Sequence, residues 1–318
     1  MISPIRSLCF NDDRQTFTII LPSQYRIFRC DPFGMIFTRE CDDLSLGCAA
    51  TYNGYRYIAL AGSPSSQAFN SKSVRIFDHQ TGQTTFEHVF QEHILNIALG
   101  SGIIVCCMHL KVEIWNINEN AILHKFENGL NVHIPLALSR DSSNVLMAGA
   151  TMKRVSLHKN VLPTSGSLKT YSFVADEAAV SLIRFSDNGN YFATAAFNGN
   201  CIRIWDCSNL CTVAVLDRGP KDDIIQTMDF SPSDDFFASC SKDGTIRIFD
   251  IRRKVPNATK KMSPACSTNL EQQLYMPRIC WLNSMIIGIT TLEGDYYKFT
   301  FNGSSIEYET TPFLKRSQ

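Results

Sequence analysis

The sequence lacks the patterns that mark several common classes of protein. No apolar run reaches the ~18 residues that a membrane-spanning helix needs, so we expect no transmembrane segment. The first residues, MISPIRSLCF, lack the basic and apolar regions of a secretory signal, and we therefore expect a soluble, cytoplasmic protein. The 30 basic and 30 acidic residues balance, which argues against a nucleic-acid partner bound through overall charge.

Motifs of catalysis and metal binding are also missing. The sequence has no G-x-S-x-G nucleophile turn, no glycine-rich phosphate loop, no HExxH pair and no GxGxxG fingerprint. Its twelve cysteines form no CxxC pair, and the cysteines and histidines show no zinc-finger spacing. We therefore expect reduced structural thiols, no metal, no cofactor and no enzymatic activity.

A short strand pattern that ends in a bulky ring recurs along the chain. The rings are Phe28, Phe77, Trp115, His158, Trp205, Phe249 and Phe299, at intervals of 49, 38, 43, 47, 44 and 50 residues. These intervals are close to the ~40–45 residues of one propeller blade. In the clearest copies, SLIRFSDNGNYFATAAFNGNCIRIWD and TMDFSPSDDFFASCSKDGTIRIFD, two more strands with polar turns precede the ring strand.

Seven copies predict an all-β, seven-bladed β-propeller of the WD-repeat type, with four antiparallel strands per blade. Seven blades of about 42 residues use roughly 294 of the 318 residues, and we expect a single domain over residues 1–318. The fourth blade is placed by interval, because VSLHK (155–159) matches the pattern poorly. The aspartates that follow three of the rings, Asp78, Asp206 and Asp250, are expected to cap turns and not to catalyse.

Between the fifth and sixth predicted blades lies the turn Leu216-Asp217-Arg218-Gly219. It is flanked by ATAAFNGNCIRIW (193–205) and SCSKDGTIRIF (239–249), while RIFRCDPF (26–33) and GDYYKFTFNGSSIEYETTPFL (294–314) lie near the two ends. With these segments, nearly the whole chain resembles the PROPPIN family, which includes the WIPI proteins of animals. Its members are seven-bladed propellers that bind phosphoinositides in autophagy.

The resemblance implies two lipid pockets, one on each side of a Phe/Leu-Arg-Arg-Gly turn, each served by one arginine. Guanidinium groups bind phosphates bidentately, and two bound headgroups hold a membrane better than one. In this sequence Asp217 replaces the first arginine, and Asp176 stands where the family has a histidine. Thr194 and Arg203 are the residues left in that pocket, so we expect it to bind phosphoinositide weakly or not at all.

The second pocket keeps more of the family's residues. Arg218 matches the second arginine, and Gly219 leaves the turn free to adopt a positive φ. Further donors are expected from the sixth blade: Ser239, Ser241, Lys242 and Thr245. The alternative for the hydroxyl residues is the ordinary turn of a WD-type blade.

A basic segment, residues 251–264, follows this pocket and contains no acidic residue. Its cations are Arg252, Arg253, Lys254, Lys260 and Lys261. The family has a membrane-dipping loop at this position, and each cation near an anionic leaflet contributes about 1 kcal/mol. We expect this segment to face the membrane, with a solvated surface loop as the alternative.

The resemblance implies a monomeric autophagy effector and scaffold that attaches peripherally to phagophore and endosomal membranes. Its expected lipids are phosphatidylinositol 3-phosphate and phosphatidylinositol 3,5-bisphosphate, and its expected protein partners include the large bridge-like lipid-transfer protein of autophagy. The alternative is a WD-repeat adaptor for proteins with lost or weakened lipid binding. Asp217 is the strongest argument for that alternative.

Overall fold

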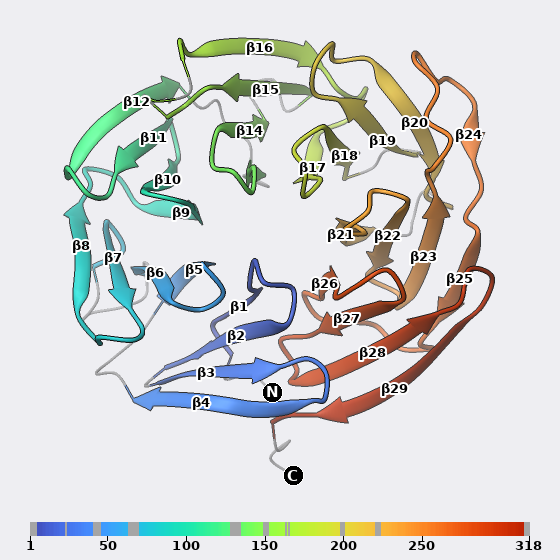
Figure 1. The fold of residues 1–318 in the computed structure, drawn as a ribbon, viewed down its shortest axis with the longest axis horizontal. Coiled ribbons are helices and arrows are strands. Elements are labelled where there is room, and N and C mark those ends of the chain that lie inside the picture. Colours follow the sequence, from blue (N-terminus) through green and yellow to red (C-terminus); the bar gives the residue numbers. More distant parts are fainter. Residues whose placement is uncertain are drawn as a thin grey trace. The chain divides into compact units, whose positions relative to one another are not determined.

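The computed structural model describes residues 5–22, 24–40, 46–62, 70–127, 135–148, 153–162, 164, 166–197, 201–219 and 224–314. Within these residues the chain is all-β, with strands β1 to β29 and no α-helix. The strands form seven sheets, each built on four antiparallel strands (Figure 1). The predicted fold class, an all-β protein with the seven blades of a β-propeller, is therefore confirmed.

The first three blades each follow the order of the chain. The first contains β1 (Ser7–Phe10), β2 (Thr16–Leu21), β3 (Gln24–Arg29) and β4 (Gly34–Glu40). The second contains β5 (Leu46–Tyr52), β6 (Tyr57–Gly62), β7 (Ser73–Asp78) and β8 (Thr84–Val89). The third contains β9 (Ile94–Leu99), β10 (Ile103–Met108), β11 (Lys111–Asn116) and β12 (Ala121–Glu127).

The remaining four blades include one that gains a fifth strand. The fourth contains β13 (Leu136–Leu138), β14 (Asn144–Ala148), β15 (Arg154–Lys159) and β16 (Lys169–Val174). The fifth contains β17 (Val180–Phe185), β18 (Tyr191–Ala196), β19 (Cys201–Asp206), β20 (Thr212–Asp217) and the added β24 (Lys261–Met262). The sixth contains β21 (Ile225–Phe230), β22 (Phe236–Ser241), β23 (Thr245–Asp250) and β25 (Cys266–Asn269). The seventh contains β26 (Arg278–Trp281), β27 (Ile286–Thr290), β28 (Asp295–Phe301) and β29 (Ile306–Pro312).

The chain divides into two compact units. Residues 1–145 and 157–171 form one unit, and residues 146–156 and 172–318 form the other. The first unit holds β1 to β13 and the second holds β17 to β29, while β14, β15 and β16 have residues in both. The expectation of one domain over residues 1–318 stays a prediction.

Every predicted ring lies in the third strand of its blade, including His158, which was placed by interval. The three aspartates that follow a ring also have the expected structural role. Asp78 accepts hydrogen bonds from the backbone N–H groups of Gln80 and Thr81, and Asp206 and Asp250 each accept one from the residue two positions later. These carboxylates therefore stabilise turns.

Three of the rings contact an aromatic side chain on the outer strand of the preceding blade. The pairs are His88 with Trp115 at 4.0 Å between ring centroids, Phe126 with His158 at 3.8 Å, and Phe173 with Trp205 at 4.9 Å. Side chains of a strand alternate between its two faces, so the residue two positions before a ring points the same way as the ring. Packing of the ring therefore determines the direction of the side chain that lies two positions before it in the strand.

Buried apolar side chains of the second strands form much of the core. All six residues of β2 and all six of β10 are buried. Cys106 and Cys107 lie in β10, and the cysteines within the described ranges are free thiols. Burial raises the pKa of Cys107 to about 12, so this thiol stays protonated and behaves as a small apolar side chain.

We predict that His158 makes the fold sensitive to acid. It stacks on Phe126, and its Nδ1 lies 3.0 Å from the Thr170 hydroxyl. Burial, with a smaller effect of nearby His124, lowers its pKa from 6.5 to about 4. The unfolded chain therefore takes up a proton first, and the folded chain loses stability as the pH falls from about 6.5 to about 4.

His158→Phe keeps the ring stack and removes the titrating group. When the pH is lowered from 7 to 5, the free energy of unfolding of the wild type should fall by about 1–2 kcal/mol more than that of the variant. Urea unfolding at a series of pH values measures this difference. An identical pH dependence in both proteins would contradict the assignment.

Candidate functional site

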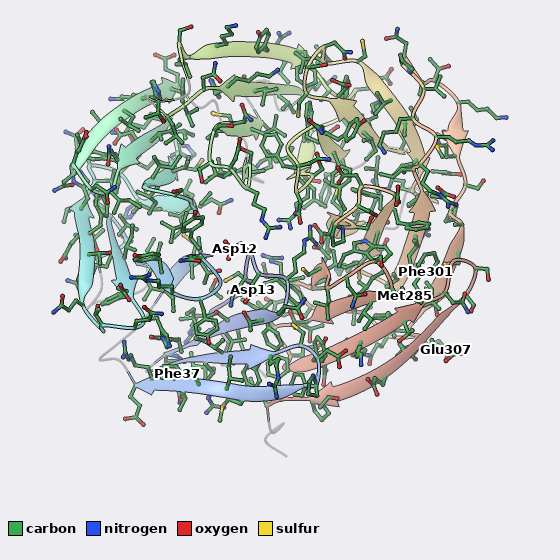
Figure 2. The ribbon with its side chains drawn as sticks, viewed as in Figure 1. Asp12, Asp13, Phe37, Met285, Phe301 and Glu307 are labelled. Atoms are coloured by element: carbon green, nitrogen blue, oxygen red, sulfur yellow. The ribbon has the colours of Figure 1, made fainter. Side chains whose placement is uncertain are left out.

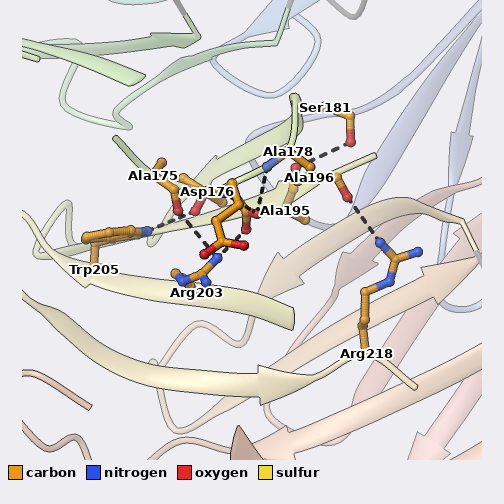
Figure 3. A network of polar contacts seen from close by, with 11 residues as sticks. Ala175, Asp176, Ala178, Ser181, Ala195, Ala196, Arg203, Trp205 and Arg218 are labelled. Atoms are coloured by element: carbon orange, nitrogen blue, oxygen red, sulfur yellow. Dashed lines mark hydrogen bonds and ion pairs between the residues drawn. The ribbon is translucent and has the colours of Figure 1, made fainter. Parts of the chain in front are cut away.

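Arg218, which follows the end of β20, is fully buried. Its Nη1 donates hydrogen bonds to the carbonyl oxygen of Ala196, at 3.1 Å (Figure 3), and to that of Phe197, at 3.3 Å. These two carbonyls lie at the end of β18, so Arg218 joins the ends of two strands of the fifth blade. The guanidinium that was expected to meet a headgroup thus lies inside the protein and holds the turn in place.

Asp217, the residue that replaces an arginine of the family, has a cation beside it. Its Oδ1 accepts a hydrogen bond from the backbone N–H of Gly219 at 3.2 Å. Nζ of Lys261, in β24, lies 3.9 Å from the same oxygen. Both side chains are nearly half exposed, so the pair contributes little to stability, but it offsets the local charge of the turn.

Gly219 is in direct contact with a guanidinium from the sixth blade. Its φ is +87°, and a Cβ added there would lie 2.6 Å from Nη2 of Arg247. Nη1 of Arg247 donates a hydrogen bond to the hydroxyl of Ser241 at 3.2 Å. Gly219, Ser241 and Arg247 therefore come together in space, and we call them the Arg247 cluster.

Arg247 was missed by the sequence analysis, although a signal for it was present. It lies two residues before the ring Phe249, as Arg203 lies two residues before Trp205. Phe249 packs in one cluster with Val213 and Leu216 of β20, so the same face of β23 brings Arg247 to the end of that strand. Comparing repeat positions, and not only motifs, would have identified it.

The other expected donors of the sixth blade lie in different environments. Ser239 is fully buried, and its hydroxyl has no hydrogen-bond partner within the described residues. Thr245 donates to a carboxylate oxygen of Asp243 at 2.8 Å and accepts from the side-chain amide of Asn269 at 2.7 Å. Lys242 is exposed. Thr245 therefore stabilises its turn, whereas the hydroxyl of Ser239 is enclosed within the blade.

The residues expected in the first pocket form a separate group, which we call the Arg203 cluster: Asp176, Thr194 and Arg203. Arg203 forms an ion pair with the carboxylate of Asp176, and its Nη1 also lies 3.5 Å from the carbonyl oxygen of Ala175 (Figure 3). Thr194 is buried, and its hydroxyl accepts a hydrogen bond from the indole N–H of Trp205 at 2.9 Å. The cation of this cluster is therefore paired within the protein.

The surroundings of Cys201 show how charge gathers near this cluster. Burial raises the pKa of the Cys201 thiol, and Asp176 adds to the rise. Arg203, Lys261 and Arg218 act in the opposite direction, because each cation favours the thiolate. Three cations thus lower the pKa of one thiol at the start of β19.

The basic segment 251–264 is attached to the fifth blade by its backbone. The N–H of Val255 donates to the carbonyl oxygen of Val213 at 3.0 Å, and the N–H of Ala258 donates to that of Thr212 at 2.9 Å. Further along, β24 pairs in parallel with β20. The segment therefore covers the outer edge of β20 (Figure 1), and the side chain of Val255 is 60% exposed.

Three of the five cations in this segment bind groups of the same chain. The contacts are Arg252 with the carboxylate of Asp250 and the ring of Phe236, Lys254 with the carbonyl oxygen of Asp234 and the ring of Tyr191, and Lys261 with Asp217. The side chains of Arg253 and Lys260 are exposed. Much of the positive charge that the sequence analysis assigned to membrane contact is thus engaged by the protein itself.

Two negative findings apply to the part of the chain that the structure describes. It contains no helix with the length and apolarity needed to cross a membrane. It also contains no group of three or more histidine, cysteine, aspartate or glutamate side chains arranged to hold a metal ion. Figure 2 shows the side chains of the described part of the chain.

Comparison with known proteins gives a consistent family match. The model of the PROPPIN family matches residues 65–299. Autophagy-related protein 18 of Yarrowia lipolytica is 22% identical, over 100% of this chain and 85% of that protein. SVP1-like protein 2 of Saccharomyces cerevisiae is 24% identical, over 86% of this chain and 69% of that protein.

Solved structures agree in fold. Kluyveromyces lactis Hsv2 superposes with a TM-score of 0.82 at 17% identity, over 97% of this chain and 98% of that one. KlAtg21, in its complex with the coiled coil of AgAtg16, superposes with a TM-score of 0.72 at 18% identity, over 98% of this chain and 100% of that one.

We predict that Gly219 is required for the Arg247 cluster. Alanine there meets two penalties, the positive φ and the contact with the guanidinium of Arg247. Gly189 is a matched control, because its φ is +70° and a Cβ added there has no atom within 4 Å. Alanine at either position should lower the free energy of unfolding by about 1–2 kcal/mol, because its backbone is held at a positive φ.

Gly219→Ala should lose about 1 kcal/mol more than Gly189→Ala, because Arg247 must move as well. The free energy of unfolding in urea measures both variants. Equal losses at the two positions would show that Arg247 is not constrained by Gly219.

Proposed function

The chain belongs to the PROPPIN family of autophagy-related, phosphoinositide-binding β-propellers, and on this premise we propose that it binds phosphoinositides as a peripheral membrane protein. The observation that carries the proposal is the Arg247 cluster. There a guanidinium, a hydroxyl and a glycine backbone meet beside the turn that the family uses for lipid recognition.

The chemistry of the Arg247 cluster suits a phosphate group. A guanidinium offers paired N–H donors to phosphate oxygens, and a hydroxyl adds a further donor. Arg247 is half-buried, so its charge interacts with a ligand more strongly than a fully solvated charge would. We assign Arg247 to the ligand, with the buried hydroxyl of Ser241 as the acceptor that orients its guanidinium. Lys242 is an exposed cation nearby in sequence.

Arg218 receives a different role in this proposal. It is buried against the carbonyls at the end of β18, so it acts as a positioning residue for the turn. Gly219 then allows Arg247 to lie against the turn. The hydroxyl of Ser239, which is the register partner of Arg247 on β22, is a further candidate donor.

The proposed lipids are phosphatidylinositol 3-phosphate and phosphatidylinositol 3,5-bisphosphate, on phagophore and endosomal membranes. Arg253 and Lys260, the exposed cations of the basic segment, support attraction to an anionic leaflet. Since the remaining cations of that segment bind groups of the chain, we propose that headgroup binding contributes more to attachment than the segment does.

The proposed biological role is that of an autophagy effector and scaffold. The family membership and the autophagy-related relatives support this role. We propose that the large lipid-transfer protein of autophagy is one partner and that the chain acts as a monomer. A related propeller, KlAtg21, is known in complex with a coiled coil of AgAtg16, which supports protein docking as a second activity of such a scaffold.

A second candidate function is a protein-docking adaptor with weak lipid binding. Two observations favour it. Arg203 is already paired with Asp176, and three cations of the basic segment are engaged within the chain. These contacts reduce the positive charge that is available to a membrane.

Vesicle flotation separates the two candidates. Wild-type protein is mixed with vesicles that contain or lack phosphatidylinositol 3-phosphate or the 3,5-bisphosphate at about 0.15 M salt. Arg247→Gln should reduce lipid-dependent flotation at least tenfold, because the guanidinium is lost. Arg75→Gln is the matched control, since Arg75 occupies the equivalent position in the second blade and pairs with Glu87 on β8 at 2.7 Å.

The expected result is that Arg75→Gln floats like the wild type. Flotation that is equally reduced in both variants would indicate general charge attraction and not a headgroup site. Absence of lipid-dependent flotation in the wild type would favour the adaptor.

A further inference from the structure

The Arg203 cluster has the form of an anion site that already contains an anion. One oxygen of the Asp176 carboxylate accepts hydrogen bonds from the backbone N–H groups of Glu177, at 2.7 Å, and Ala178, at 3.2 Å. The other oxygen accepts from the guanidinium of Arg203. Two backbone N–H groups and a guanidinium that converge on one point are a typical donor set for a phosphate.

This carboxylate is well enclosed. The side chain of Asp176 is 7% exposed and that of Arg203 is 27% exposed. Because an ion pair is stronger when it is shielded from water, an external anion must compete with a partner that is held in place by three hydrogen bonds. Thr194 lies on the strand paired with Arg203, and its hydroxyl accepts from Trp205, so its own hydrogen remains available to donate.

The repeat allows an internal comparison between two blades. Asp176 lies two residues after the end of β16, and Gly219 lies two residues after the end of β20. Each of these residues faces the arginine that precedes the ring of the next blade by two positions, Arg203 in one case and Arg247 in the other. At equivalent positions, therefore, one arginine meets a carboxylate and the other meets a residue without a side chain.

We propose that Asp176 is the specificity-determining residue that keeps phosphate away from Arg203, so that the chain takes up one phosphorylated headgroup where its architecture provides for two. The inference rests on the proposed function, since it concerns the same class of ligand. By this inference, Asp176 is the residue that prevents phosphate binding at the Arg203 cluster. Asp217 is not, because it faces Lys261. A single headgroup makes membrane attachment weaker than two would, because the second binding event is lost.

The test uses the full chain with Arg247→Gln as background, so that the Arg247 cluster does not contribute. Calorimetric titration with inositol 1,3-bisphosphate compares this background with the same protein carrying Asp176→Ala. Removing the carboxylate should raise the affinity for the headgroup at least tenfold. Adding Arg203→Gln should abolish that gain, because the cation that accepts the phosphate is lost.

Asp176→Asn provides a second variant that keeps the side-chain oxygen for the backbone N–H groups. It should fold even if the alanine variant does not, and it should show a gain of a few fold. No gain in a folded Asp176 variant, or a gain that survives Arg203→Gln, would overturn the proposal. These outcomes are independent of the vesicle experiment, in which failure of the proposed function appears as absence of lipid-dependent flotation of the wild type or as equal reduction in Arg247→Gln and Arg75→Gln.

Discussion

Packing of the ring at the end of each third strand determines where the charged side chains of the two clusters point. Trp205 contacts Phe173 of the preceding blade, and Phe249 packs with apolar residues of β20. Since strand side chains alternate, the residue two positions before a ring must point toward the same neighbour. Arg203 and Arg247 thus reach the end of the preceding outer strand. The positions of both arginines follow from apolar packing, which is much stronger than any single surface ion pair.

The group that each arginine contacts depends on one residue, which follows the outer strand of the preceding blade. Asp176 supplies a carboxylate, whereas Gly219 supplies only backbone. The positive φ of Gly219 and its contact with Arg247 make it unsuited to a side chain, while Asp176 is held by backbone N–H groups. A single substitution at this position can therefore change the group that the arginine contacts and leave the blades unchanged.

The blades could be predicted because ring, turn and strand patterns act over a few residues, and even His158 was placed correctly by its interval. The clusters were predicted less well because they depend on contacts between distant segments. Lys261 lies 3.9 Å from Asp217, and the backbone of Val255 binds that of Val213. No local pattern indicates either contact. The burial of Arg218 could not be read from the sequence for the same reason.

The most direct measurement is a crystal structure of the wild-type chain soaked with inositol 1,3-bisphosphate. The account predicts a phosphate within hydrogen-bond distance of the Arg247 guanidinium, and Arg203 still paired with Asp176. A phosphate bound to Arg203 with the Asp176 carboxylate displaced would contradict it, as would a headgroup that does not contact Arg247.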